Sequence, residues 1–263
     1  MVTPLAIVSG ATGGIGQVVA QRLWAEGYSI LALGKTPEKC LVLQDWFLAH
    51  SRPDQHEYVT CMDLTRANEY GLIERVLTAS SQPFTLLVTC HGAVPVPGPA
   101  LYAADAMRIV YETDVLGTFA LCQLSGRYML EQRTGCIVLV SSLHARQTYP
   151  ARVPYATAKT AICGMARALA VEWGLFNIRV NSIVPWQVDG PRSQQFMSEA
   201  AAYGYDLLEA YKQRSPMRRL VQPEEIAETV LWLARTPSVN GADIVLDSGV
   251  SASMWHRGFT TQE

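Results

Sequence analysis

A tyrosine and a lysine stand four residues apart in this chain, at Tyr155 and Lys159. Residues at positions i and i+4 of a helix share one face, so the two side chains are neighbours if this segment is helical. An ammonium group beside a phenol stabilises the phenolate and lowers the phenol's pKa from about 10. A phenol tuned in this way is a usable general acid or base. Ser142 precedes the tyrosine by 13 residues (155 − 142) and adds a hydroxyl to the set.

A glycine-rich segment near the amino end predicts a nucleotide site. Gly10, Gly14 and Gly16 follow an apolar run over residues 5–8, and apolar residues at helical spacing begin at Ile15. Glycines let the backbone turn sharply and let a pyrophosphate approach bare amides at a helix N-terminus. A strand before the loop and a helix after it are the context that such a site requires. The alternative is a tight turn between strand and helix that binds nothing.

The residues after the second predicted strand bear on the choice between NAD and NADP. That strand covers residues 30–33, and Gly34 and Lys35 follow where NAD-preferring sites usually place Asp or Glu. A lysine attracts the 2′-phosphate of NADP, whereas a carboxylate repels it. We expect NADP(H), with NAD(H) less favoured; the alternative is that Lys35 is a solvated surface charge. Asp63 is a candidate acceptor for the adenine amino group, or else a turn residue before Thr65.

Composition limits the class of protein. The chain has 263 residues, of which 49% are hydrophobic and 17% are charged, and it suits one α/β domain over residues 1–263. Its net charge of −2 comes without a Lys/Arg-rich block, so we expect no nucleic-acid partner. The chain start lacks the basic region of a signal peptide, and no apolar stretch is long enough to span a bilayer, so we expect no membrane association.

The six cysteines are spread along the chain and form no CxxC pair. We expect a reducing compartment, a cytoplasmic location, no disulfide framework and no metal site.

Strand-like and helix-like segments alternate along the sequence. The expected strands cover residues 5–8, 30–33, 57–62, 86–90, 136–140, 179–183 and 243–246, and the expected helices cover residues 15–26, 37–50, 67–80, 103–132, 155–174 and 223–235. This alternation predicts a doubly wound parallel sheet with helices on both faces. Ligands of such sheets bind beyond the carboxyl ends of the strands. Two segments break the rhythm: residues 93–99, which hold three prolines and which we expect to form a loop over a strand end, and residues 189–215, which we expect to form a mobile substrate lid or else a helical hairpin. A tail follows from about residue 251.

From Ser9 to about Gly249 the chain resembles the short-chain dehydrogenase/reductase family, through its glycine loop and its Tyr-x-x-x-Lys motif. The resemblance implies a Rossmann-type sheet of seven strands, a homodimer or homotetramer, and reversible interconversion of a ketone and an alcohol. It also implies that Tyr155 donates a proton to the carbonyl oxygen, that Lys159 holds the nicotinamide ribose, and that Ser142 hydrogen-bonds the substrate oxygen.

The same resemblance implies a set of cofactor-binding residues. They are Gly10, Thr12, Gly13, Gly14, Ile15, Gly16, Gly34, Lys35, Asp63, Leu64, Gly92, Tyr155, Lys159, Pro185 and Val188. It implies a substrate pocket as well, for which the candidates are His144, Gln147, Tyr149, Trp186 and Gln187. Aromatic and hydrogen-bonding groups of this kind favour a medium-sized, partly polar or cyclic ketone.

The chain departs from the family pattern at several places. The family's fourth catalytic residue is an Asn in the long central helix, and the aligned residue here is Asp114. We expect Asp114 to pair with Lys159 and to shift the pH profile of a retained activity. Cys90 and His91 replace residues of the Asn-Asn-Ala-Gly segment, of which only Gly92 remains. Such departures favour a specialised enzyme, plausible in a secondary biosynthetic pathway.

Two alternative functions stay open at this point. One is reduction of a 3-oxoacyl thioester on a carrier protein, for which Arg146, Arg152, Arg192, Arg218 and Arg219 are candidate phosphate contacts. The other is a non-catalytic NADP(H)-binding protein. Enoyl reduction is disfavoured, because family members with that activity place the tyrosine further from the lysine.

Overall fold

The computed structural model describes residues 3–95 and 98–253. Seven parallel strands form one sheet in the order β3-β2-β1-β4-β5-β6-β7. The strands are β1 (Leu5–Ser9), β2 (Ser29–Gly34), β3 (Glu57–Cys61), β4 (Phe84–Thr89), β5 (Gly135–Val140), β6 (Ile178–Pro185) and β7 (Asp243–Leu246). The order reverses between β1 and β4, and this switch point is where ligands of such sheets bind. The predicted Rossmann-type fold is confirmed.

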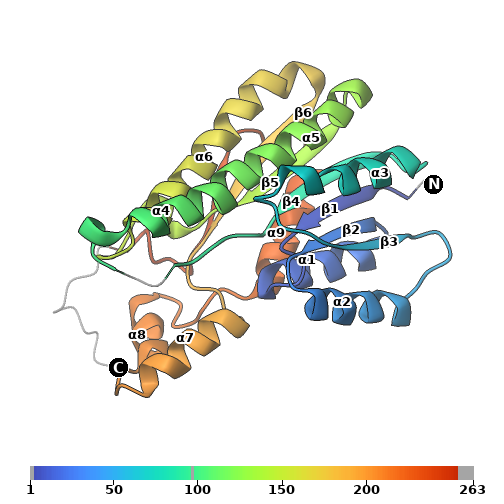
Figure 1. Ribbon diagram of the computed structural model, residues 1–263. Helices are drawn as coiled ribbons and strands as arrows, with labels where there is room; N and C mark the ends of the chain where they lie inside the picture. The colour runs from blue at the N-terminus through green and yellow to red at the C-terminus, as the bar shows by residue number, and fades with distance from the viewer. Residues whose placement is uncertain (1–2, 96–97, 254–263) are drawn as a thin grey trace.

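Helices cover both faces of the sheet (Figure 1). The helices on one face are α3 (Gly71–Ala79), α4 (Ala104–Val110), α5 (Gly117–Gln132) and α6 (Val153–Trp173), and those on the other face are α1 (Gly14–Ala25), α2 (Pro37–Ala49) and α9 (Pro223–Arg235). Each face has its own apolar core, centred on Trp24 and Phe47 under α1 and α2, and on Ile73 and Trp173 under α3 and α6. Strand residues buried on both faces explain the continuous apolar runs in the sequence.

The central helix is not continuous as predicted. A π-helical turn over Tyr111–Leu116 separates α4 from α5, so the predicted helix over residues 103–132 is corrected to three segments. A π turn inserts one extra residue into the helix and changes the direction of the side chains that it carries. The predicted helix over residues 67–80 is also corrected, because it begins with a 3₁₀ turn at Ala67–Glu69 before α3.

Residues 189–215 form two helices, α7 (Pro191–Ala201) and α8 (Leu207–Arg214), which is the helical hairpin that we gave as the alternative to a lid. They stand apart from the two layers of helices, on the side of the molecule where α4 and the start of α6 also lie (Figure 1). Most of the predicted tail from residue 251 lies outside the described residues.

Candidate active site

Tyr155 and Lys159 both lie on the first turns of α6, as the spacing predicted. The Lys159 ammonium is 5.6 Å from the centre of the Tyr155 ring. The lysine side chain is 6% exposed, and its ammonium also lies 3.5 Å from the Val140 carbonyl at the end of β5. Helix α6 is fixed against this strand end, because the Ser141 hydroxyl donates to the Lys159 carbonyl at 2.8 Å.

Asp114 lies on the π-helical turn and pairs with Lys159. Its Oδ2 atom is 3.1 Å from the Lys159 Nζ atom, and its side chain is fully buried. Its Oδ1 atom accepts a hydrogen bond of 2.7 Å from the backbone N–H of Ala93. No described residue donates a well-aligned hydrogen bond to Oδ2. The positive charge of Lys159 is therefore the main interaction that offsets the cost of burying this oxygen. Burial acts to lower the pKa of Lys159, but Asp114 and Tyr155 outweigh it and raise the pKa above its usual value.

Ser142 begins the 3₁₀ turn Leu143–Ala145, which packs against α6. Its Oγ atom accepts a hydrogen bond of 3.3 Å from the backbone N–H of His144. The His144 ring lies 5.4 Å from the Tyr155 ring and 5.3 Å from the Tyr149 ring, in edge-on contacts. Burial, and then the charge of Arg152, lower the pKa of His144 to about 4, so this imidazole is neutral at neutral pH.

Trp186 continues this aromatic cluster. Its ring lies 5.8 Å from Tyr149 and 6.1 Å from Tyr211 of α8. The residue is 6% exposed, and its indole N–H has no hydrogen-bond partner among the described residues. Trp186 therefore fills space in the core below the cluster rather than standing at its edge. Of the other substrate candidates, Gln187 is half-buried and Gln147 is exposed.

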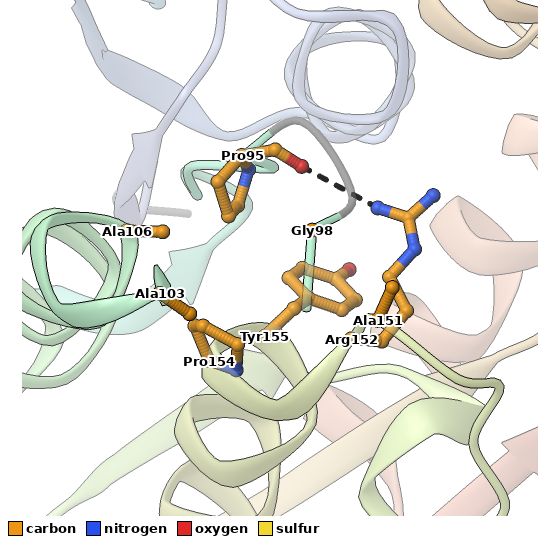
Figure 2. Close-up of a pocket in the computed structure, with 8 residues that line it drawn as sticks. All are labelled: Pro95, Gly98, Ala103, Ala106, Ala151, Arg152, Pro154 and Tyr155. Carbon is orange, nitrogen blue, oxygen red and sulfur yellow. Dashed lines mark hydrogen bonds between the residues drawn. The ribbon is translucent and has the colours of Figure 1, made fainter. Parts of the chain in front are cut away.

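A pocket of about 70 Å³ opens beside Tyr155. Its walls come from the segment after β4, from α4 and from the start of α6, and are lined by Pro95, Gly98, Ala103, Ala106, Ala151, Arg152, Pro154 and Tyr155. Figure 2 shows the Tyr155 ring reaching into the middle of this pocket, between the Pro95 side and the Arg152 side. The lining combines proline, alanine and glycine residues with one phenol and one guanidinium.

The glycine loop between β1 and α1 fits a dinucleotide phosphate. A Cβ atom on Gly16 would lie 2.2 Å from the Gly10 carbonyl oxygen, and a Cβ atom on Gly10 would lie 2.6 Å from the backbone nitrogen of His91. Gly10 also has a positive φ of 66°, which favours glycine. No side chain caps the N-terminus of α1, and its first turn carries no acidic residue. Its backbone N–H groups are therefore available to an anion.

Lys35 and Asp63 form an ion pair at the ends of β2 and β3. The Lys35 Nζ atom is 2.9 Å from the Asp63 Oδ2 atom, and Lys35 is 72% exposed. The Asp63 Oδ1 atom accepts hydrogen bonds from the backbone and side chain of Thr65. Burial acts to raise the pKa of Asp63, but the bonds from Lys35 and Thr65 outweigh it and lower the pKa to about 2. Asp63 thus makes the turn that we gave as its alternative role.

His91 packs beneath the glycine loop. Its Nδ1 atom is 2.6 Å from the Ser9 hydroxyl, and its Nε2 atom is 3.2 Å from the Thr118 hydroxyl. Burial lowers its pKa to about 4, so His91 is a neutral packing residue at neutral pH.

The chain matches a family model described as enoyl-(acyl carrier protein) reductase over residues 10–251. It is 28% identical to D-threitol dehydrogenase of Mycolicibacterium smegmatis, over 93% of this chain and 92% of that protein. It is 29% identical to carbonyl reductase [NADPH] 2 of Sus scrofa, over 94% and 96%. The fold is similar to that of levodione reductase, with a TM-score of 0.89, 24% identity and coverage of 96% and 100%.

The chain belongs to the short-chain dehydrogenase/reductase family. This short-chain dehydrogenase/reductase is an oxidoreductase of the ketone/alcohol class. No helix among its described residues could cross a membrane, and the described residues contain no group of three or more His, Cys, Asp or Glu arranged to hold a metal.

Sequence reasoning missed two residues of the short-chain dehydrogenase/reductase site, Tyr211 and Arg214 on α8. The Arg214 guanidinium lies over the Trp186 ring at 5.5 Å. A tyrosine and an arginine at positions i and i+3 of a helix share one face, and this spacing was the available signal. This spacing alone could not place the two residues at the site, because the sequence does not show which elements the segment between β6 and α9 packs against.

Proposed function

We propose that this enzyme is an NADP(H)-dependent reductase of medium-sized, partly polar or cyclic ketones, with Tyr155 as the general acid. The observation that carries the proposal is the half-buried Tyr155 next to the buried pair of Lys159 and Asp114, beside a pocket at the carboxyl ends of the strands. A proton donor held next to a buried cation and opening onto a pocket suits a reaction that forms an alkoxide.

In the reduction direction, Tyr155 donates its proton to the carbonyl oxygen, and the Ser142 hydroxyl donates a hydrogen bond to the same oxygen. The Lys159 ammonium stabilises the tyrosinate that results, because the two groups are neighbours in a site with little solvent. Asp114 holds Lys159 in place and keeps it protonated. In the oxidation direction, the tyrosinate accepts the proton of the alcohol.

The loop residues Gly10 to Gly16 would hold the pyrophosphate, and Lys159 and Val188 would hold the nicotinamide half. The bound nicotinamide supplies or accepts the hydride. Lys35 would contact the 2′-phosphate of NADP(H). Its ion pair with Asp63 holds the ammonium at the ends of β2 and β3. This placement supports NADP(H), although Asp63 also offsets part of the charge that would attract the phosphate.

The departures from the family pattern support a specialised biosynthetic enzyme rather than a housekeeping reductase. The His144 ring lies next to Tyr155, Tyr149 packs on His144, and the buried Trp186 supports Tyr149 from below, which suits a ring or other flat substrate. A non-catalytic role is disfavoured by the retention of both Tyr155 and Lys159.

We also infer a homodimer or homotetramer in the cytoplasm. The inference of an assembly rests on apolar side chains exposed along α4, the π turn and α5, among them Ile109, Leu116 and Phe119, which are 52%, 59% and 41% exposed. The cytoplasmic location rests on six cysteines that are all free.

Cofactor binding measured by nucleotide fluorescence, NADPH against NADH, tests the cofactor proposal. We expect the parent protein to bind NADPH at least about tenfold more tightly and Lys35→Ala to lose this preference, because one direct charge–phosphate contact is worth about 1.5–3 kcal/mol. Lys39→Ala, at a second exposed lysine, is the matched control and keeps the preference. Equal binding of both nucleotides by the parent would contradict the proposal.

A further inference from the structure

Two half-buried arginines at the active site, Arg152 and Arg214, have no acidic partner in the part of the chain that the structure describes. No carboxylate of the described residues lies within 4.0 Å of either guanidinium. Arg214 donates no side-chain hydrogen bond to the described residues, and Arg152 donates one, of 3.5 Å, to the Pro95 carbonyl. A guanidinium carries five N–H donors and no acceptor, so most of these donors lack a protein partner.

Arg152 lies at the catalytic tyrosine, and Arg214 lies at the far end of the aromatic cluster beside it. Arg152 lines the pocket of Tyr155, and Figure 2 shows its guanidinium extending across that pocket toward Pro95. Arg214 lies over the rings of Tyr149 and Trp186, at 5.4 and 5.5 Å from their centres. The Tyr149 ring connects to Tyr155 through the ring of His144. The two cations therefore approach the site from α6 and from α8.

The backbone holds Arg152 in a costly arrangement. The preceding residue, Ala151, has a positive φ of 64°, which is unfavourable for a residue with a Cβ atom. Its carbonyl accepts a hydrogen bond of 3.3 Å from the Gly98 N–H across the mouth of the pocket. Such strain persists where the surrounding structure requires it and is common at functional sites.

Three other arginines are neutralised by acids. Arg146 and Arg167 both pair with Asp243, at 3.4 and 2.9 Å, and Arg219 pairs with Glu225 at 2.7 Å. The surface that could bind the phosphates of a carrier protein therefore has fewer unpaired arginines, because Arg146 and Arg219 were two of its five candidates. Arg192 and Arg218 also lack an acidic partner among the described residues, but both are exposed, whereas Arg152 and Arg214 are half-buried.

We propose that Arg152 and Arg214 bind an anionic group, a carboxylate or a phosphate, carried by the ketone or alcohol substrate. The planar fork of a guanidinium matches both anions, and partial burial strengthens such contacts. This inference rests on the proposed ketone–alcohol chemistry, and it names the class of substrate for that chemistry.

Two matched pairs of probes test the proposal by isothermal titration calorimetry on the protein saturated with NADP⁺. The pairs are 4-oxocyclohexanecarboxylate with its methyl ester, and dihydroxyacetone phosphate with dihydroxyacetone. We expect at least one anionic probe to bind about tenfold or more tightly than its neutral partner, because a charge-assisted hydrogen bond contributes that much. The pair that shows the preference identifies carboxylate or phosphate.

Arg152→Gln and Arg214→Gln each remove one cation, and we expect each to reduce the preference, measured as the ratio of the two dissociation constants, about tenfold. Arg152→Lys, which keeps the charge but not the fork, should restore part of it. Arg75→Gln, at an exposed arginine of α3, is the matched control. Circular dichroism of every variant checks that the fold is kept.

Neutral and anionic probes that bind equally in both pairs would overturn the proposal, and so would a preference that survives both Gln variants. Turnover of the same four probes with NADPH is measured in parallel. Consumption of NADPH without any preference for the anionic probes would support the proposed function and contradict the proposed anion site. A preference for the anionic probe that depends on the two arginines, without turnover of any probe, would support the anion site and contradict the proposed function.

Discussion

Asp114 places a negative charge where the resemblance to the family implies a neutral Asn. Taking Lys159 and Asp114 out of water costs several kcal/mol for each ion, and the pair offsets that cost only when the contact is close and other bonds are satisfied. Here the contact is 3.1 Å and one carboxylate oxygen accepts the Ala93 N–H. The pair therefore places a fixed negative charge within reach of the ammonium that stabilises the tyrosinate.

Replacing Asp114 by Asn tests this effect on the pH–rate profile. Asn removes the negative charge but keeps an oxygen for Lys159 and Ala93, so the tyrosinate becomes easier to form. We expect the rising limb of the alcohol-oxidation profile to shift to lower pH by about one unit. Initial rates between pH 5 and pH 10 measure the shift. A profile identical to that of the parent would show that Asp114 does not tune the relay.

His91 should make stability depend on pH. Its pKa of about 4 in the folded state lies below its usual value of 6.5, so the unfolded state binds a proton first as the pH falls. Stability is therefore full above pH 6.5 and is lost as the pH falls toward 4. His144, also near 4, adds a similar loss.

For His91 alone we expect a loss of about 2 kcal/mol between pH 7 and pH 5. His91→Gln, which retains a polar partner for Ser9 and Thr118, should reduce the pH dependence by roughly half, because His144 remains. Urea unfolding at the two pH values measures the difference. The same pH dependence in parent and variant would contradict the role of His91.

At the scale of elements, the sequence predicted the order and type of the strands and main helices, because buried parallel strands and amphipathic helices leave clear patterns. The π turn was not predictable, since one inserted residue barely changes the apolar spacing around Asp114. The pairing of Lys35 with Asp63 was missed for another reason: the two residues are distant in sequence and meet only because β2 and β3 are adjacent.

The glycine loop gives a prediction at this scale. A Cβ atom at Gly16 would lie 2.2 Å from a backbone oxygen of the loop, which cannot move aside as a side chain would. We expect Gly16→Ala to destabilise the protein by about 2 kcal/mol and to abolish binding of NADPH. Gly71→Ala, where a Cβ atom meets nothing within 4 Å, is the control and should change stability by less than about 0.5 kcal/mol. Chemical denaturation and nucleotide fluorescence measure both effects, and normal binding by Gly16→Ala would contradict the account of the loop.

At the scale of the whole molecule, the exposed apolar side chains of α4, the π turn and α5 are best explained by a second copy of the chain. We expect light scattering after size exclusion to give a multiple of 28.9 kDa. Phe119→Arg should weaken the assembly, because a charge in an apolar interface is costly. Leu41→Arg, at an exposed apolar residue of α2, is the control. A parent protein of 28.9 kDa would contradict the inference.

The central claim is that Tyr155 performs the proton transfer of an NADP(H)-dependent ketone reduction. Its most direct test is NADPH consumption with a panel of cyclic and polar ketones, comparing the parent with Tyr155→Phe, while nucleotide fluorescence confirms that both bind NADPH. We predict turnover by the parent and a loss of about 10²–10⁴-fold in the variant, since a positioned general acid contributes that much. Binding of NADPH without turnover of any ketone by the parent, or equal rates in the two proteins, would contradict the account.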